Sequence, residues 1–562
     1  MRLSPDSRRL AAARHSAVMS AGGPAAVQSA AGTLDVTGAS RAGRTAYRAA
    51  DPFDRVFAGR NASRRSADGN WLNERLRVLP RVRDVVRNEP LADSAVEQKV
   101  SLIVGTGWKF SSAPPPEAFG LTPDDDRYLR LTDSIEDAWR RATGDPLFRL
   151  DYEEALPFDL QLDLAVRHRI VDGESIGLFN WIEDRGDGFP FHTAIQLVHP
   201  ARLANPMGRA DGWGGAIQIA LKDGTSYTLD AEDVRAGVAT DERGRDIALH
   251  ILRAHPVDIG KSAIKSMQGD WIDRYETPGR PRYFRSLRRR EIGQTRGVSD
   301  LASSLRRFGA FQEATDTEAR SRLINATIFA SISSHLDPEY LVELFGNDAD
   351  KLLEARAAFY EASGSDINAN KVLRTFPGDN FDINDKVRAA NAYADFFGAL
   401  AVQAGAGAGV PANMMLRDFS KENFSSARTA INDAFRMAKR ERIVDVLNFA
   451  QPALLCILQE AFYDGRLALP PGAPDFMERP DVYVKGTWIG PRREYVDPVK
   501  EAQGDRMQVE NFQASFSDIA EERGKPLDEV IAERARDQRR FDRANVAPGS
   551  FDQIAAVRGG SE

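Results

Sequence analysis

The sequence predicts an α+β fold with several core-forming units, and three observations support that prediction. Apolar residues make up 42% of the 562 residues and charged residues 28%, which is the composition of an ordinary globular protein. In several long segments, apolar residues recur at three- and four-residue spacing, which is typical of helices. Between about residues 165 and 275, short alternating segments separated by glycine-containing turns indicate antiparallel strands instead.

The first fifty residues (1–50) differ from the rest of the chain. They are rich in alanine, serine and glycine, and seven arginines stand against two acids, which gives a net charge of +5. An organelle transit peptide has a similar composition. We favour a flexible basic arm, because the segment has no long apolar stripe.

Two helices are expected before the strand-rich region. Apolar residues follow helical spacing from Asn73 until Asn88-Glu89-Pro90 interrupts them, and a second helix is expected from about Leu91 to Val104. Asp172-Gly173-Glu174 stands at the head of the strand region. Asp-Gly favours a tight turn between strands, although an acidic pair is the alternative interpretation.

An acidic segment is expected to interrupt a second helical region. Residues 299–333 lack proline, with Ser299 as a cap. The acidic segment, about 336 to 385, should contain a helix over Tyr340–Phe359 and a strand over Val372–Phe376. It holds 11 acids against 4 bases, so its net charge of −7 equals that of the whole chain. Such a segment is either a solvated surface or a surface that steers a basic partner.

Two further helices and a loop follow the acidic segment. An apolar helix is expected from Val387 to Ala404, and Gly405–Gly409 predicts a flexible loop after it. A long helix is then expected from Ser426 to Phe462, capped by Ser425 and Ser426, with a kink at Pro452 because proline lacks a backbone donor. Asp481–Trp488 is expected to form a strand, and the last 65 residues are helical in pattern until a loose tail.

Three cations stand close to the start of this long helix. Arg417, Lys421 and Arg428 lie where the helix dipole already presents positive charge, which disfavours them. They either form ion pairs within the chain, with Asp418 or Glu422, or they contact something outside it.

The sequence shows no catalytic, cofactor or metal site. Gly260-Lys261-Ser262 lacks the earlier glycine of a phosphate-binding loop, since His255 and Pro256 stand there. None of the seven histidines forms a His-x-x-x-His pair or stands beside clustered carboxylates. Cys456 lies among apolar residues and is read as buried. No apolar stretch reaches the roughly 20 residues that span a membrane.

Six groups of short motifs occur in one order between residues 81 and 470, and together they resemble the portal proteins of tailed double-stranded-DNA bacteriophages, specifically the lambda-type family. The motifs are Arg81-x-Arg83-Asp84 with Arg87-Asn88-x-Pro90 and Val104-Gly105-Thr106-Gly107; Asp172-Gly173-Glu174; Gly293-Gln294-Thr295-Arg296-Gly297-Val298-Ser299; Phe376-Pro377-Gly378-Asp379; Gly409-Val410-Pro411 with Arg417-Asp418-Phe419-Ser420 and Asn423-Phe424-Ser425-Ser426-Ala427-Arg428; and Asp464-Gly465-x-Leu467-x-Leu469-Pro470. The chain departs from the family pattern at Phe419 and Phe424, where tyrosines are expected, so any hydrogen bond from those hydroxyls is missing.

The resemblance implies a portal fold, with the chain divided into consecutive parts. These are a flexible N-terminal arm (1–50), an α/β wing (51–313), a stem helix (314–335), a small acidic α/β clip (336–385), a second stem helix (386–404), a tunnel loop (405–424), a long Pro-kinked helix with a return to the wing (425–497), and a crown of C-terminal helices with a loose tail (498–562).

The resemblance also implies a function without catalysis and without a cofactor or metal. Portal proteins form a homo-oligomeric ring, usually of twelve copies, at one capsid vertex of the virion, after assembly in the host cytoplasm. Double-stranded DNA passes through the ring during packaging and ejection. The large terminase subunit, the head–tail connector and the major capsid protein are the other partners, and no membrane is involved. The candidate channel contacts are Arg417, Lys421, Asn423 and Arg428, and the candidate docking acids are Asp337, Glu339, Glu343, Asp348 and Asp350. The alternatives are another structural phage component, such as a capsid or tail-tube protein, and a phage enzyme fused to a binding module.

Overall fold

The computed structural model describes residues 63–544, except for 187, 207–210, 212–216, 221–225, 258–267, 277–278, 328–329, 335–342, 344–347, 364–378, 384–389, 421 and 493–497. The chain divides into two units, Met1–Arg64 and Arg65–Glu562, and the fold below is that of the second. The expected arm (1–50), the Gly260-Lys261-Ser262 motif and the expected strand at Val372–Phe376 lie outside the described residues.

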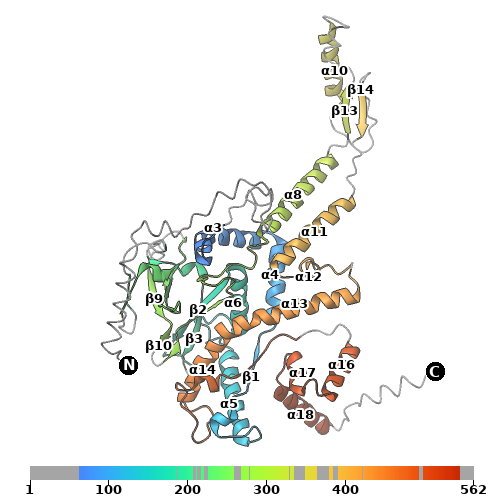
Figure 1. Ribbon diagram of the computed structural model, residues 1–562. Coiled ribbons are helices and arrows are strands. Elements are labelled where there is room, and N and C mark those ends of the chain that lie inside the picture. Colours follow the sequence, from blue (N-terminus) through green and yellow to red (C-terminus); the bar gives the residue numbers. More distant parts are fainter. Residues whose placement is uncertain are drawn as a thin grey trace, which may run out of the picture. The chain divides into compact units, whose positions relative to one another are not determined.

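Helices and antiparallel sheets are mixed throughout the unit, so the α+β class is confirmed (Figure 1). Helices α3 (Ala67–Asn88) and α4 (Pro90–Ile103) confirm the first two predicted helices. Glu89 takes an extended conformation between them, and Pro90 begins α4 because the first turn of a helix does not need its missing N–H.

Antiparallel strands occur in the predicted region from Glu174 onward, after the end of a helix at Asp172. A three-stranded sheet has the order β12 (Tyr283–Leu287), β2 (Glu174–Trp181), β3 (Thr193–Val198). A four-stranded sheet and two strand pairs accompany it: β6 (Val234–Arg235), β7 (Val238–Thr240), β8 (Asp246–Leu252) and β9 (Gly269–Asp273); β4 (Ile217–Ala220) with β5 (Ser226–Leu229); and β10 (Tyr275–Glu276) with β11 (Arg280–Pro281).

The Asp-Gly step was predicted to form a turn between two strands, and that prediction is wrong. Helix α6 (Phe158–Asp172) ends at Asp172, and Gly173 takes the left-handed conformation (φ 84°) that terminates a helix before β2 begins. Helix α6 packs against α3, α4 and β2, which places both acids of the motif in the protein interior.

A further strand pair joins two segments that lie far apart in the sequence. Strand β1 (Lys109–Ser112) pairs with β15 (Gly486–Ile489), beside α5 (Asp126–Thr143). The strand expected over Asp481–Trp488 is therefore wrong in its first half, where α15 (Pro480–Tyr483) forms a single turn of helix.

The helices on either side of the acidic segment differ from the prediction at their ends. Helix α8 (Leu305–Thr327) is followed by strand β13 (Ala330–Ser334), so the expected stem helix over 314–335 stops earlier. Ser299 does not cap it, because its Oγ accepts the N–H of Leu301 in a turn before the helix. Helix α11 (Ala390–Ala408) packs against α8, with the rings of Phe311 and Phe397 5.0 Å apart.

In the part of the acidic segment that the structure describes, a helix starts later than expected and a strand lies near the segment's end. Helix α10 (Ala349–Ser363) begins nine residues after the expected Tyr340, and β14 (Asp379–Ile383) pairs antiparallel with β13. The strand pair therefore joins the end of α8 to the residues that lead into α11 (Figure 1).

The long helix is continuous through Pro452 but changes its winding just before it. Helix α13 (Phe424–Asp445) leads into one π-helical turn (Val446–Ala450) and then α14 (Gln451–Tyr463). The Gln451 N–H donates to the Val446 carbonyl, one residue further back than in an α-helix. The wider turn accommodates the proline, which cannot donate and crowds the preceding turn.

This helix also satisfies the length and composition of a membrane span, over Ser425–Tyr463. Because 56% of its most apolar window is buried inside the protein, it packs as a core helix. Most of α14 is buried, and Cys456 within it has no exposed surface. The C-terminal region is helical as predicted, with α16 (Pro498–Glu510), α17 (Phe516–Glu522) and α18 (Leu527–Ala544).

A buried ion pair joins two of the sequence motifs. The fully buried Arg296 guanidinium donates from Nε to Glu174 Oε1 at 2.6 Å, and it also donates to the carbonyls of Pro200, Leu203 and Ala236. Burial alone would raise the pKa of Glu174, but the charges of Arg296, Arg75 and Arg285 lower it, so the carboxylate is ionised.

Two glycines allow this contact to form. A side chain on Gly297 would place its Cβ 2.1 Å from the carbonyl oxygen of Gly173, and a side chain on Gly173 would collide with the Gly297 backbone. The two motif loops therefore approach so closely that only glycine fits at these two positions.

A second buried network connects the sheet-bearing part to the long helix. The Arg169 Nε donates to Asp445 at 2.9 Å, and Lys99 pairs with Asp300 and, at 3.0 Å, with Glu441. Helices α4, α6 and α13 are thus held by charges that water cannot reach, and each charge depends on its partners.

Replacing Arg296 with methionine should destabilise the protein by about 3–5 kcal/mol, because Glu174 loses its closest partner and three carbonyls lose their donor. The measurement is the urea midpoint and the melting temperature. Arg81→Met, at an exposed position on α3, is the matched control and should change stability by less than about 0.5 kcal/mol. Equal midpoints for the two variants would refute the importance of this contact.

Cys456 should not react with a thiol reagent in the folded protein. Burial raises the pKa of its thiol to about 12, so neither access nor thiolate is available at pH 8. Titration with Ellman's reagent should detect no thiol before denaturation and one per chain afterwards. Rapid reaction of the native chain would show that α14 opens.

Candidate functional site

The glycine-rich stretch, which was predicted to be a flexible loop, is the end of a helix. Helix α11 runs through Gly405 and Gly407 to Ala408. A Cβ on Gly405 would lie 2.6 Å from the Val410 carbonyl oxygen, and one on Gly407 would lie 2.8 Å from the Ser304 Cβ. These glycines therefore permit close packing, and Gly409 (φ 78°) ends the helix in the left-handed conformation.

A short helix follows and fixes the near end of the remaining loop. In α12 (Ala412–Leu416), the Met415 side chain is buried and its carbonyl accepts a hydrogen bond from Ser94 of α4 at 2.7 Å. Arg417 follows in the left-handed conformation (φ 53°) and is exposed. Only residues 417–423 then separate α12 from α13, a shorter connection than the expected tunnel loop over 405–424.

Asn423, and not the serine pair, caps helix α13. Its Oδ1 accepts the Ser426 N–H at 2.8 Å, and Ser426 Oγ accepts the Asn423 N–H at 3.1 Å. The predicted cap at Ser425 and Ser426 is therefore wrong by two to three residues, although Ser426 takes part as the third helical residue. Glu422 also accepts from Ser426 Oγ, which places an acid where the helix dipole favours one.

Arg428 has a partner that was not predicted. Its guanidinium lies 3.5 Å from Glu501 of α16, and Glu501 is buried while Arg428 is partly exposed. The ion pair thus joins α13 to the C-terminal helices. The predicted partners of Arg428 were Asp418 or Glu422. Within the described part of the chain Arg417 has no ion-pair partner, and Lys421 is outside it.

Five acids of the acidic segment are exposed. Glu343, Asp348 and Asp350 are all exposed, and Asp348 pairs with Lys351 at 2.9 Å on the surface. Glu354 and Glu361 are exposed on α10 as well. Asp337 and Glu339 lie outside the described residues.

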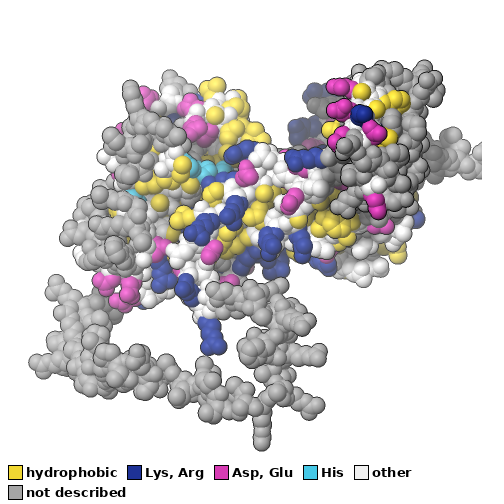
Figure 2. Space-filling model, turned by 90° about the horizontal axis from the view of Figure 1, so that it is seen from above, with side chains coloured by type: hydrophobic (Ala, Val, Ile, Leu, Met, Phe, Trp, Pro, Cys, Tyr) yellow, Lys and Arg dark blue, Asp and Glu magenta, His cyan; other side chains and the backbone are white. Residues whose placement is uncertain are grey.

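Positive side chains gather in another part of the chain. Figure 2 looks onto the side of the molecule where α3 lies, and lysine and arginine side chains cluster there. Arg77, Arg81 and Arg87 are exposed on α3, and Arg306 and Arg307 are exposed at the start of α8. The charge of the chain is therefore divided between an acidic segment and a basic face.

One group of potential metal ligands was missed by the sequence analysis. His168, Asp172 and His199 lie together among the described residues. The group does not have His-x-x-x-His spacing, because a histidine and an aspartate stand four residues apart on α6. His-x-x-x-Asp spacing would have found that pair, but only the fold brings His199 beside it.

Comparison with known proteins gives a consistent result. The pattern that defines the lambda family of phage portal proteins matches residues 53–442. The portal protein of Escherichia phage N15 is 25% identical over 90% of this chain and 92% of its own length. Portal protein B of Escherichia phage lambda is 24% identical over 89% of this chain and 90% of its own length.

Solved structures give a weaker likeness. One is a neck of a native gene transfer agent particle with C12 symmetry, which is 11% identical over 81% of this chain and 94% of that chain, with a TM-score of 0.38. The assignment to a family therefore depends on the sequence matches.

Replacing Asn423 with alanine should loosen the first turn of α13, because the Ser426 N–H loses its acceptor. The expected loss is about 1 kcal/mol, seen as roughly fivefold faster hydrogen exchange of the first-turn amides. Asn432→Ala, inside the same helix, is the control and should leave those amides unchanged. Unchanged exchange in Asn423→Ala would show that the cap does not hold this turn.

Proposed function

The chain belongs to the lambda family of phage portal proteins, and we propose that its copies assemble into a ring, usually of twelve in this family, around a channel for double-stranded DNA. The observation that carries this proposal is the extent of the family match. It runs from before α3 to near the end of α13, so it includes both helices around the acidic segment and the segment itself.

We assign the parts of the ring to elements that share these positions in the chain. Helices α8 and α11 form the stem, because they pack on each other and frame the acidic segment. Helix α10 with strands β13 and β14 forms the clip. Residues 417–423 form the tunnel loop, and α16, α17 and α18 form the crown.

A channel for DNA must guide the duplex without holding it. Each phosphate contact adds salt-dependent affinity, so a ring of many such contacts would retain DNA and stop its movement. The net charge of −7 on each copy supports a surface that repels the duplex. Arg417 is exposed and without an ion pair among the described residues, so it is our candidate for a transient phosphate contact.

The pairing of Arg428 changes its proposed role. Because its guanidinium pairs with Glu501, its charge is already balanced within the chain. Asn423 likewise uses its side chain to cap α13. Arg417 and Lys421 therefore remain the stronger candidates for channel contacts, and Arg428 and Asn423 position the loop that carries them.

The exposed acids of the clip support a docking role. Glu343, Asp348 and Asp350 present negative charge to solvent, and such a surface attracts a basic partner and fixes its orientation. We propose that this surface receives the large terminase subunit during packaging and the head–tail connector afterwards. The motor supplies ATP hydrolysis, so no catalytic step is assigned to this chain.

The location follows from the same assignment. The ring occupies one vertex of the capsid in the virion, held by the major capsid protein, and it assembles in the host cytoplasm before packaging. The basic face on α3 and α8 lies apart from the acidic clip in sequence and differs from it in charge, so the two surfaces suit different partners.

Reversing the charge at Arg417 and Lys421 should lower the amount of DNA retained per particle, because both positions then repel phosphate in every copy. The measurement is DNA per purified particle after packaging with the Arg417→Glu/Lys421→Glu variant. Arg243→Glu, at an exposed turn between β7 and β8, is the control. Normal packaging and retention in the double variant would exclude channel contacts by these residues.

Neutralising Glu343, Asp348 and Asp350 together should weaken binding of the terminase subunit while rings still form. The measurement is terminase binding to purified rings over a range of salt concentrations. The wild type should lose affinity as salt rises, and the neutralised variant should bind weakly with a flatter salt dependence. Identical curves for the two proteins would count against docking at this surface.

A further inference from the structure

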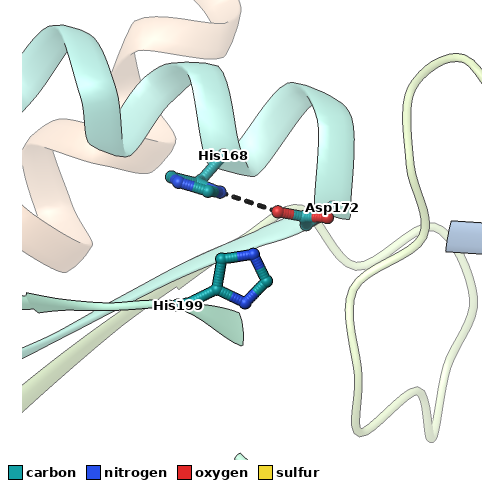
Figure 3. A group of neighbouring side chains, drawn as sticks. All are labelled: His168, Asp172 and His199. Atoms are coloured by element: carbon teal, nitrogen blue, oxygen red, sulfur yellow. Dashed lines mark hydrogen bonds and ion pairs between the residues drawn. The ribbon is translucent and has the colours of Figure 1, made fainter. Parts of the chain in front are cut away.

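Three side chains from two separate parts of the chain meet at the end of helix α6. His168 and Asp172 lie one turn apart on α6, and His199 follows the last residue of β3. One ligand atom from each lies within 4.8 Å of the other two, and the histidine rings face the carboxylate (Figure 3). Helix α6 and the end of strand β3 thus converge on one small polar group.

The contacts within the group orient each ligand. His168 Nδ1 donates to Asp172 Oδ2 at 2.7 Å, while Arg83 of α3 donates to the other oxygen, Oδ1, at 2.6 Å. His199 Nδ1 accepts the Ala201 N–H at 3.1 Å. That bond turns the other ring nitrogen, Nε2, toward the carboxylate (Figure 3).

We propose that His168, Asp172 and His199 bind a divalent transition-metal ion, with zinc as the representative ion. Two imidazoles and one carboxylate form the ligand set that open zinc sites use, with water in the fourth position. Imidazole nitrogens favour zinc, nickel and copper, whereas magnesium and calcium require oxygen ligands.

The protonation states suit such an ion. Burial, followed by the charge of Arg83, lowers the pKa of His199 to about 4, so this ring is neutral at pH 7. Burial would raise the pKa of Asp172, but the hydrogen bond from His168 and the charge of Arg83 lower it, so the carboxylate is ionised. An ion therefore does not have to displace a proton from an imidazolium at His199.

Binding requires small adjustments that the surroundings allow. The 2.7 Å between His168 Nδ1 and Asp172 Oδ2 must open to about 3.3 Å when both atoms bind one ion at about 2.0–2.2 Å. The ring proton of His168 moves to its Nε2. The ring proton of His199 moves to Nδ1, which gives up the long hydrogen bond from Ala201.

The surroundings also set the strength and the access of the site. Arg83 holds Asp172 from its far oxygen, as an orienting group does in known metal sites, but its charge opposes a cation and weakens binding. About a third of the His168 side chain is exposed, so an ion can enter from solvent. The His255 ring packs edge-on against His199, with centroids 4.9 Å apart, and adds a third imidazole beside the group.

The test is zinc binding to the full-length chain without an affinity tag, after treatment with a chelator. Equilibrium dialysis should find one zinc ion per chain that a large excess of magnesium does not displace. His199→Gln and His168→Gln should each weaken binding at least about tenfold. His192 lies outside the group and stacks on Trp181. The His192→Gln variant should therefore bind zinc as the wild type does.

Two further readouts separate lost ligands from lost structure. Zinc should raise the melting temperature of the wild type and of His192→Gln, and not that of the two ligand variants. Circular dichroism of the metal-free variants should match the wild type. Binding below one ion per chain in the wild type, or unchanged binding in both ligand variants, would overturn the proposal.

Discussion

The ion pair between Arg296 and Glu174 holds together segments that lie more than a hundred residues apart. Arg296 is fully buried and donates to Glu174 and to three backbone carbonyls near β3 and β7, so the loop before α8 is fixed to the sheet-bearing part. A buried charge is tolerated only where its partners are in place. The close contact of Gly173 with Gly297 puts those partners in place, because any side chain at either position would separate the loops.

This ion pair also fixes the helices that begin or end beside it. The loop that carries Arg296 leads directly into α8, and Asp172, which precedes Gly173, ends α6. Helix α6 in turn contacts α13 through Arg169, Asp445 and Glu441. The direction of α8 and the end of α13 are thus both set by buried charges. This explains why Asp172, Glu174 and Arg296 of the sequence motifs lie in the interior and not at an exposed site.

The sequence predicts those features that depend on local spacing. Helices α3 and α4 and the antiparallel strands follow from periodicity, because each helix or strand buries one face whatever its partners are. Strand β13 was predicted as helix, since its pairing with β14 depends on residues about fifty positions away. Gly405 and Gly407 were predicted as a loop, because their close contacts with Val410 and Ser304 exist only in the folded chain.

At the candidate site, Asn423, Ser425 and Ser426 are all residue types that cap helices well. The reciprocal hydrogen bonds between Asn423 and Ser426 make Asn423 the cap. Arg428 could not be paired from sequence, since Glu501 is distant along the chain.

We propose that this chain forms a closed ring with a channel along its axis. Electron microscopy of the purified full-length chain tests it most directly. The account predicts flat rings of uniform size with a central opening, seen end-on, with a narrower stem and clip on one side in side views. Long tubes, closed shells or only monomers at high protein concentration would contradict it.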